Sequence, residues 1–436
     1  MKVKQNRDGA TGRRGDTATR VSALLFVVLV CFFTFALTSS AHEPITTKVR
    51  FNKELVRILQ RSCLGCHHPG GIAFSLTTYD DARPWAKAIK EEVLERRMPP
   101  WRAVKGYGDF GNAPSLTQRD IDLIVNWVEG GAPKGEDKDV PAGPLFSNDW
   151  QLGKPDLILK ADNAAMIAAD ANEYRTFILP ANSKEDRWLS AIDVLPGNAS
   201  VVHCATVYLL KPESDQQPGA TMMQVRNTER ISVPGGASTI GDVRAVLATW
   251  VPGQKTVAFE SGTAQLIPVG AAFLVAIHYR GSNEPEKDLS AIGLYFSKTP
   301  PRKRVSEVTI NDIDGVITAS TQPQRIVLSS TTQTDTEAIA IRPSAHSSIT
   351  SLQATAHRPD GSQEVLIWVR GHQSDWQPTY YFKRPALLPK GTRVEIIAYL
   401  ENSGESSNTL PKPVRWSDIS NQPLCTLLTS SVDVQK

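Results

Sequence analysis

The sequence predicts a multidomain protein in which a helical N-terminal domain precedes an all-β region of jelly-roll or sandwich type. Three observations predict this architecture. The chain has 436 residues, too many for one hydrophobic core. Its N-terminal part has apolar residues at helical spacing, and from about Trp150 short β-rich runs alternate with turn residues. The apolar and charged fractions, 41% and 21%, are those of globular domains rather than of a disordered chain.

Residues 1–41 are expected to direct export. A basic stretch precedes the apolar run VSALLFVVLVCFFTFALTSSA, which ends in small residues as a signal peptide does. The part of this run that precedes the closing TSSA is about 17 residues long, near the lower limit for a membrane span, so an uncleaved anchor is the alternative. The leader carries +4 of the formal net charge of +3, which leaves −1 for the rest. We therefore expect no nucleic-acid-binding surface.

Residues 43–141 are expected to form the helical domain. In VRFNKELVRILQRSC, apolar residues recur at helical spacing from Val49 to Leu59. The stretch LTQRDIDLIVNWVEGGAP begins with Thr117 as a helix cap and ends in a Gly-Gly pair and a proline, which predict a helix stop. The Gly- and Pro-rich stretch GAPKGEDKDVPAGP then predicts a linker.

Two β domains are expected over residues 150–304 and 305–436. Runs such as ASVVHCATVYLL, AAFLVAIHYRG and QEVLIWVRG have the composition of buried strands. Asp360-Gly361 stands between two such runs and predicts a hairpin. The run Val305–Thr321 is expected to join the two domains, and no stretch after residue 150 has the pattern of a long helix.

The motif Cys63-x-x-Cys66-His67 predicts a covalently bound haem c. Two thiols at this spacing can form thioethers with the haem vinyl groups, and the following histidine can ligate the iron. A thioredoxin-like redox pair would need a βαβ unit, which the sequence does not indicate. A zinc site would need a second pair of ligands, which His68 alone does not provide. A Cys63–Cys66 disulfide is the remaining alternative.

Met98 is the expected second axial ligand of the haem iron. It precedes two prolines in ERRMPPW, which would hold the loop rigidly. No other methionine lies in the haem segment. The alternative is that Met98 is a core residue.

The segments CLGCHHPGG, RRMPPW and LTQRDIDLIVNWVEGGAPKG resemble the haem domain of an exported bacterial family. In that family a mono-haem cytochrome c is fused to a copper type II, ascorbate-dependent monooxygenase-like region. The resemblance continues through PGNASVVHCATVYLL, WVPGQ, IPVGAAFLVAIHYRG and LPKGTRVEIIAYLENS, which look like peptidylglycine α-hydroxylating monooxygenase. It implies a class I-like cytochrome c domain, two copper-binding jelly-roll domains, and a periplasmic or periplasm-facing, membrane-anchored protein.

The same resemblance implies six copper ligands, of which this sequence retains three. The first copper of the family is held by three histidines, and His203 and His278 match two of them, with Cys204 at the third position. The second copper is held by a His-x-His pair and a methionine. His346 matches one of that pair, Ser344 stands at the other position, and no methionine lies near the C-terminus.

Cys204 is open to three interpretations. With His203 and His278 it would complete the His₂Cys set of an electron-transfer copper site. Neighbours on a regular strand point to opposite faces, so His203 and Cys204 can share one ion only at a strand end or a bulge. Alternatively, Cys204 is a small buried hydrophobe, or it forms a disulfide with Cys425.

We therefore expect an exported haem electron-transfer protein that exchanges electrons with a redox partner protein or a small-molecule donor. Copper-dependent hydroxylation is expected to be lost or altered, because the second copper lacks most of its ligands. One alternative is an active copper monooxygenase that hydroxylates a C–H bond with substitute ligands such as Cys204 and Cys425. The other is a non-enzymatic haem redox sensor. No role is expected for His357 or His372, and the aromatic residues of DWQPTYYF are expected to pack within strands.

Overall fold

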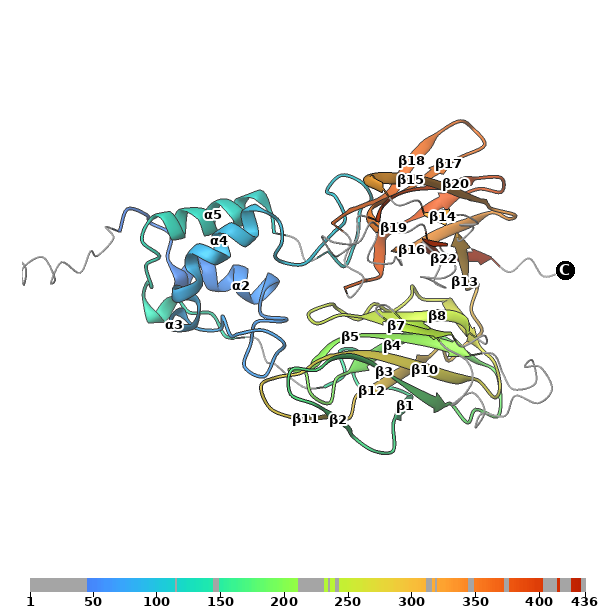
Figure 1. Cartoon of the computed structure of the whole chain (residues 1–436), viewed down its shortest axis with the longest axis horizontal. Coiled ribbons are helices and arrows are strands. Elements are labelled where there is room, and N and C mark those ends of the chain that lie inside the picture. Colours follow the sequence, from blue (N-terminus) through green and yellow to red (C-terminus); the bar gives the residue numbers. More distant parts are fainter. Residues whose placement is uncertain are drawn as a thin grey trace, which may run out of the picture.

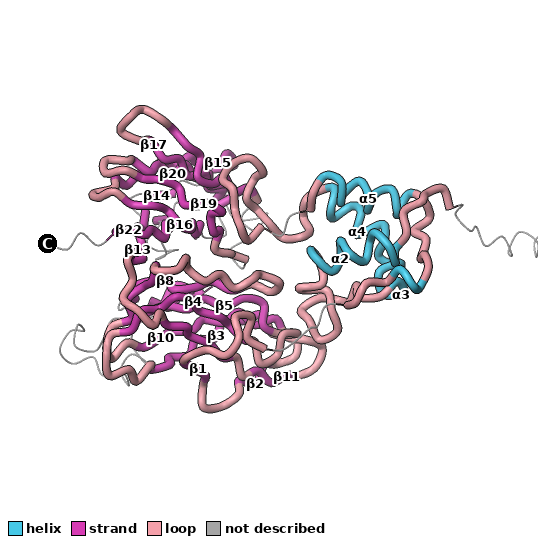
Figure 2. Tube along the Cα trace, turned by 180° about the vertical axis from the view of Figure 1, so that it is seen from behind, coloured by secondary structure: helices cyan, strands magenta, loops and turns pink. Residues whose placement is uncertain are grey.

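A helical N-terminal unit lies beside a β region made of two packed units (Figure 1). The view from behind shows the same separation of helices from strands (Figure 2). The computed structural model describes residues 45–113, 116–143, 149–210, 231–233, 236–239, 243–310, 316–317, 320–343, 349–371, 376–402, 414–415 and 425–432. The predicted leader lies outside these ranges, and no helix within them is long and apolar enough to cross a membrane.

Short helices pack around one apolar core in the N-terminal unit. The core includes Phe51, Leu55, Ile124 and Trp127, all nearly inaccessible to solvent. The Trp127 indole N–H donates to the Pro133 carbonyl oxygen at 3.0 Å, which satisfies its one polar group. The elements are η1 (Phe51–Leu55), α2 (Val56–Ser62), α3 (Tyr79–Ala82), η2 (Arg83–Trp85), α4 (Ala86–Leu94), α5 (Gln118–Glu129) and η3 (Asp137–Asp139).

Capping boxes begin α3 and α5. The side chains of Thr78 and Thr117 accept hydrogen bonds from the backbone N–H groups of Asp81 and Asp120, whose carboxylates accept from the cap N–H groups in return. Helix α5 ends at Glu129, directly before the Gly-Gly pair. The predicted start of this helix after Thr117 and its predicted stop are confirmed.

The first β unit is a sandwich of two antiparallel sheets. One sheet has the strand order β3-β10-β5-β8, and the other is the β1-β12-β4-β9 part of an eight-stranded sheet. Val207, Phe273 and Ile277 lie in the core between them. The strands are β1 (Leu157–Lys160), β3 (Asn172–Pro180), β4 (Arg187–Leu195), β5 (Val202–Leu210), β8 (Val243–Trp250), β9 (Thr263–Ile267), β10 (Ala272–Arg280) and β12 (Ala291–Phe296), with the small pairs β2 (Ala165–Ile167) with β11 (Glu286–Asp288) and β6 (Ile231–Val233) with β7 (Gly236–Thr239).

The second β unit is built in the same way. Its two antiparallel layers are β13-β22-β16-β19 and β15-β20-β17-β18, with Ile341, Leu366 and Ile396 in the core. Strands β17 and β18 form the predicted hairpin, and Gly361 in its turn has φ of 85°. The strands are β13 (Lys303–Ile310), β15 (Ser320–Thr331), β16 (Thr336–Pro343), β17 (Ile349–His357), β18 (Gln363–Arg370), β19 (Tyr380–Leu388), β20 (Arg393–Asn402) and β22 (Cys425–Val432), with the pair β14 (Val316–Ile317) and β21 (Val414–Arg415).

One continuous sheet runs through both β units. Strand β13 pairs with β9 of the first unit in parallel, from Lys303 opposite Thr263 to Val305 opposite Gln265, and with β22 of the second unit along its whole length. The expected boundary between residues 304 and 305 therefore falls inside a strand that both units share. The β-rich character predicted from the sequence is confirmed, and the described residues after 150 include no helix.

The loop between α4 and α5 packs on the second β unit rather than on the helices. Its backbone forms strand-like bridges from Ala103 to Val369 and from Phe110 to Phe382. The ring of Trp101 packs 4.6 Å from that of Tyr380. Residues in the middle of the range expected for the helical domain thus join the core of a different unit, through contacts that are far apart in sequence.

A buried polar junction ties the three units together at Thr379. The Thr379 hydroxyl accepts from Arg342 Nε at 3.0 Å and lies 2.8 Å from the Thr249 hydroxyl of β8. Its carbonyl oxygen accepts from Asn112 of the α4–α5 loop at 2.7 Å and from Gln254 of the first β unit at 3.3 Å.

Arg342 and Glu307 form an ion pair inside this junction. Arg342 Nη1 lies 3.3 Å from Glu307 Oε1, and the arginine is 2% exposed. The arginine also donates to the Val246 carbonyl oxygen at 2.9 Å, while the Val246 N–H donates to Glu307. Burial raises the pKa of Glu307, which Arg342 opposes. Removing one partner would leave the other charge buried and unpaired.

Replacing Arg342 with Ala is expected to lower the free energy of unfolding by about 3–5 kcal/mol, because Glu307 then keeps a buried charge without a partner. Denaturant unfolding followed by tryptophan fluorescence measures this. The control is Lys383→Ala, which removes an exposed ion pair with Asp109 between the second unit and the α4–α5 loop and should change stability little. Equal effects of the two substitutions would contradict the role given to the junction.

Candidate metal centre

A β-bulge in β5 places His203 and Cys204 beside His278 of β10. Cys204 lies opposite His278, but the next pair along the ladder is Val202 with Tyr279, so His203 is the extra residue. Residues next to each other on a regular strand face opposite sides, and a bulge re-aims one of them. The structure therefore contains the bulge that a site shared by these two neighbours requires.

The three side chains form a compact set of potential ligands. Their ligand atoms all lie within 4.8 Å of one another, and Nδ1 of His203 is 3.1 Å from Nδ1 of His278. Two ligands that each lie about 2.0–2.1 Å from one tetrahedral ion are about 3.3 Å apart. Both histidines are buried, at 6% and 4% exposure. The donor set and its spacing fit a bound transition-metal ion.

Side chains of β3 fix the orientation of His278. The Asn172 side-chain oxygen lies 2.8 Å from His278 Nε2, and because this oxygen can only accept, Nε2 carries the proton. Nδ1 then has its lone pair directed toward His203. The ring of Tyr174 stacks on His278 at 4.3 Å and 10°. A hydrogen bond at the far nitrogen of a histidine is how proteins hold a metal ligand in place.

The second β unit covers this cluster with Trp376. Its ring lies 5.4 Å from that of His203, at an angle of 64°. The expectation that the aromatic residues of DWQPTYYF serve strand packing holds for Tyr380, which lies in the core, but is wrong for Trp376. Trp376 precedes the start of β19, so strand alternation does not dictate where its side chain points. The group formed by His203, Cys204 and His278, called the metal cluster below because its side chains could hold one ion, thus lies between the two β units.

Asn172, Tyr174 and Trp376 were not expected at the site. Tyr174 lies directly opposite His278 in the β3–β10 ladder, so the strand pairing explains its place. The pairing of two strands about 100 residues apart is a long-range contact, which local residue patterns do not reveal.

The residues Cys63, Cys66 and His67 lie on the turn that follows α2. The backbone N–H groups of Cys66 and His67 both donate to the Cys63 carbonyl oxygen, at 3.1 and 3.0 Å. The Phe74 carbonyl oxygen lies 3.0 Å from His67 Nδ1 and can only accept, so Nδ1 carries the proton and Nε2 keeps a lone pair. Desolvation lowers the pKa of His67, which favours the neutral, ligating form.

Burial favours the protonated form of both thiols. Burial raises the pKa of Cys63 to about 12 and that of Cys66 to about 11. Catalytic thiols of redox proteins have a lowered pKa instead. Both cysteines are free, so the disulfide alternative is not formed either. Thioether formation with a haem would replace both thiol protons, so it is compatible with this burial.

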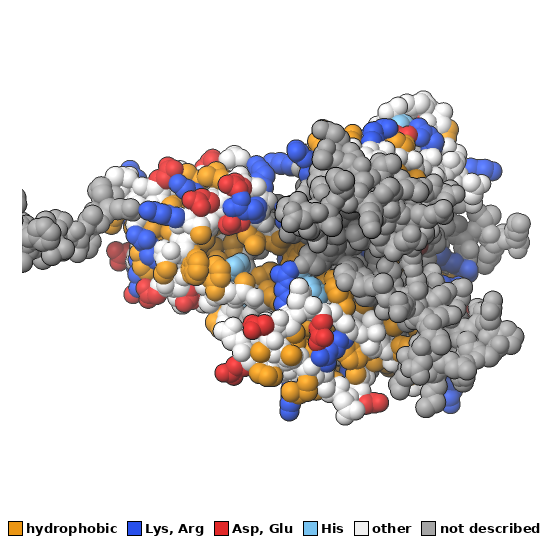
Figure 3. All heavy atoms as spheres, viewed as in Figure 1, with side chains coloured by type: hydrophobic (Ala, Val, Ile, Leu, Met, Phe, Trp, Pro, Cys, Tyr) orange, Lys and Arg blue, Asp and Glu red, His pale blue; other side chains and the backbone are white. Residues whose placement is uncertain are grey.

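An exposed apolar surface adjoins His67. The Phe74 ring lies 4.9 Å from His67 and stacks at 4.3 Å on Trp85, and both aromatic residues are nearly half exposed. Met98 is 43% exposed, so its interpretation as a core residue is wrong. Hydrophobic side chains gather around a histidine on this face of the helical unit (Figure 3). The exposed rings of Phe74 and Trp85, the two thiols and His67 Nε2 are groups of the kind that a covalently bound porphyrin would need.

Among the described residues, the candidates Cys425 and His357 do not belong to the group formed by His203, Cys204 and His278. His346, with Ser344, lies outside the described residues, as does His372. Cys425 begins β22 and is fully buried in the core of the second unit, where burial raises its pKa to about 12. No disulfide joins Cys204 and Cys425, so the interpretation of these two residues as a bridge is wrong, while Cys425 as a substitute copper ligand stays a prediction. His357 instead lies 3.6 Å from Glu395.

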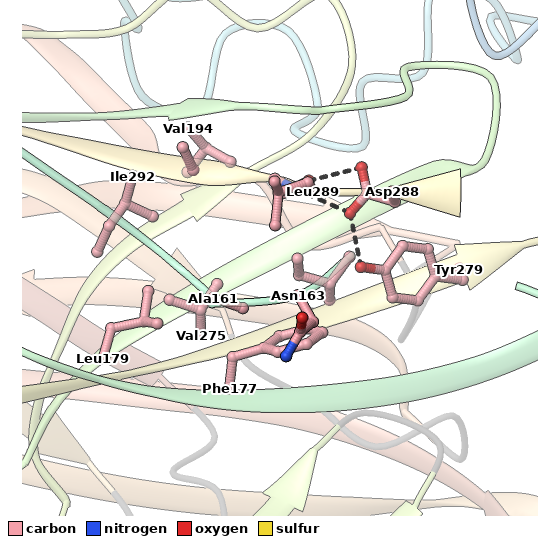
Figure 4. A pocket seen from close by; sticks show the side chains of 13 residues that line it. Ala161, Asn163, Phe177, Leu179, Val194, Val275, Tyr279, Asp288, Leu289 and Ile292 are labelled. Atoms are coloured by element: carbon pink, nitrogen blue, oxygen red, sulfur yellow. Dashed lines mark hydrogen bonds between the residues drawn. The ribbon is translucent and has the colours of Figure 1, made fainter. Parts of the chain in front are cut away.

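A small hollow between the sheets of the first unit lies on the opposite face of β10 (Figure 4). Its walls are mainly apolar, and Tyr279 donates to Asp288 at 2.7 Å. The same carboxylate accepts from the backbone N–H groups of Asn198 and Ser290. Burial raises the pKa of Tyr279, and its hydroxyl stays protonated. Since these polar groups bind one another, the hollow is a part of the core.

No protein family and no curated protein matches the chain. Among solved structures it is similar to the infectious bursal disease virus Gx strain structure, with 11% identity over 68% of this chain and 81% of that one, and a TM-score of 0.17. It is also similar to the major capsid protein P2 of bacteriophage PM2, with 11% identity over 58% and 98% of the two chains and a TM-score of 0.19. Similarity this low carries no argument about function.

Replacing His278 with Ala is expected to abolish tight copper(II) binding, because the cluster loses the ligand that Asn172 orients. Asn172→Ala should weaken binding by about 10–100-fold, since the ligand remains but its orientation is freed. Competition titration with a copper chelator measures both affinities. His357→Ala removes a histidine outside the cluster and should leave the affinity unchanged. Unaltered copper binding by the His278 variant would exclude this cluster as the site.

Proposed function

We propose that this chain is an exported electron-transfer protein that carries one c-type haem and one copper ion. The observation that carries the proposal is the gathering of His203, Cys204 and His278 within 4.8 Å, covered by the second β unit. The same chain has a C-x-x-C-H turn whose histidine keeps a free lone pair at Nε2. Transfer of one electron between two redox centres needs no site for a substrate. A haem and a copper ion would therefore suffice for it.

The helical unit would hold the haem through four residues. Cys63 and Cys66 would form the thioethers, His67 Nε2 would ligate the iron on one side, and Met98 would supply the second axial ligand. The haem would add a reversible one-electron couple. The exposed rings of Phe74 and Trp85 support this assignment. Exposed apolar surface is costly in water, and a haem bound at His67 would cover it.

The first β unit would hold the copper with a His₂Cys set. This donor set is typical of copper sites that transfer electrons without binding a substrate. Copper bound to a thiolate would lower the pKa of Cys204 and keep it deprotonated. Asn172 holds His278 in the ligating tautomer, and Trp376 shields His203 from solvent. Restricting solvent access is one way proteins tune a metal's potential.

The ligand losses favour electron transfer over hydroxylation. A copper monooxygenase of the resembling family would need a second copper that binds oxygen through two histidines and a thioether. Ser344 replaces one histidine, and Cys425, near the position of the thioether, lies in an apolar core. The presence of two redox-capable ligand sets in one chain favours transfer over the sensor alternative. The electron donor would be a redox protein or a small reductant outside the cell's cytoplasm.

Replacing Cys63 and Cys66 with Ser is expected to abolish covalent haem attachment in a host that exports and matures c-type cytochromes, since both thioether sulfurs are lost. Haem staining after denaturing electrophoresis measures attachment. His68→Ala, which changes the neighbouring histidine, should keep both the attached haem and its spectrum. If the wild-type protein acquires no covalent haem under these conditions, the proposed function is refuted.

A further inference from the structure

The C-x-x-C-H turn touches the first β unit directly. The Cys66 Sγ atom lies 3.3 Å from the carbonyl oxygen of Pro252, although 186 positions separate them in sequence. Pro252 belongs to the turn Val251–Gln254, which follows β8 and is closed by a hydrogen bond from the Gln254 N–H to the Val251 carbonyl oxygen at 3.1 Å. The Cys66 sulfur, which would form one thioether to the haem, thus contacts a hydrogen-bonded turn of the first β unit.

Two glycines make this approach possible. A Cβ added to Gly65 would lie 2.8 Å from Gly253 Cα, closer than real Cβ contacts come. A Cβ added to Gly253 would lie 3.1 Å from Cys66 Sγ, and Gly253 has φ of 75°, which favours glycine. A larger residue at position 65 would meet backbone and push the two segments apart, and one at position 253 would strain its own backbone and crowd the Cys66 sulfur. The contact therefore depends on glycine on both of its sides.

The turn Val251–Gln254 is connected through the chain and one strand pairing to the metal cluster. It is continuous with Trp250, the last residue of β8, which pairs with Ala205 in the β5–β8 ladder. Ala205 is the chain neighbour of Cys204, one of the three potential copper ligands. From Cys66 to Cys204 the connection crosses the contact between Cys66 Sγ and the Pro252 carbonyl oxygen, three peptide units and one strand pairing.

Hydrogen bonds from the second β unit and from the turn's own unit hold the turn in position. The Gln254 side chain donates to the Thr379 carbonyl oxygen of the second β unit at 3.3 Å. The Gln254 carbonyl oxygen accepts from Gln151 at 3.2 Å, and Gln151 accepts from the Thr256 N–H at 3.0 Å. A turn fixed from both sides keeps a constant separation between the two sites.

We propose that the turn Val251–Gln254 is the electron bridge between the haem and the copper cluster, and that Gly65 and Gly253 set its contact distance. This rests on the proposed function. In the step, one electron leaves ferrous haem, which becomes ferric, and reduces copper(II) to copper(I). No bond is made or broken and no proton moves. An external reductant supplies the electron to the haem.

The test uses full-length protein matured with haem and loaded with copper(II), with both contents measured first. A flash-generated flavin reductant delivers one electron to the ferric haem, and reoxidation is followed in the haem visible absorption. In the wild type we expect first-order reoxidation at a rate independent of protein concentration, and none without copper. Gly253→Ala should slow this step several-fold. Gly270→Ala is the matched control, because Gly270 has φ of 72° and open space around it.

Gly65→Ala provides a second, independent variant, with Gly143→Ala as its control because Gly143 also has open space. In copper-free protein, hydrogen exchange of the peptide spanning 250–256 should rise in both bridge variants and in neither control. Wild-type electron-transfer rates in both bridge variants, or a rate proportional to protein concentration, would overturn the bridge while leaving the proposed function intact. Absence of haem or copper in the loaded wild type would overturn both.

Discussion

The arrangement of the whole molecule depends on the buried polar junction at Thr379. Arg342 and Glu307 are charged groups inside the protein, and they are stable there only while they face each other and the backbone of Val246. Thr379 extends this network to Asn112 of the α4–α5 loop and to Gln254 of the first β unit. Because directional hydrogen bonds fix all of the partners at once, the junction sets where the C-x-x-C-H turn and the metal cluster lie relative to each other.

The β-bulge at His203 has a comparable role on a smaller scale. Without it, His203 would point into the sandwich core and only Cys204 and His278 would share a face. With it, three ligand atoms meet on the face of the sheet where Trp376 packs against His203. Burial of two histidines side by side, next to a half-buried cysteine, supports the interpretation of this cluster as a metal site.

The sequence predicts the local features well and the long-range ones poorly. The cap at Thr117, the hairpin turn at Gly361 and the β-rich region follow from residue preferences over a few positions, and the structure confirms them. The sequence shows that His203 and Cys204 can share an ion only at a strand end or a bulge, but it does not show that β5 contains that bulge. The contacts of Trp376 and the packing of Trp101 on the second unit join segments far apart in the chain, so no local pattern encodes them. His203 and His278 were proposed from a family resemblance, and the structure independently brings them together.

The most direct test of the account is the copper content per haem of oxidised protein after periplasmic maturation, copper loading and desalting, measured together with the visible spectrum. The account predicts one copper per haem and a thiolate-to-copper absorption band that disappears in Cys204→Ser. The absence of copper, or one copper per haem with the same spectrum in the Cys204→Ser variant, would contradict a His₂Cys electron-transfer centre in this protein.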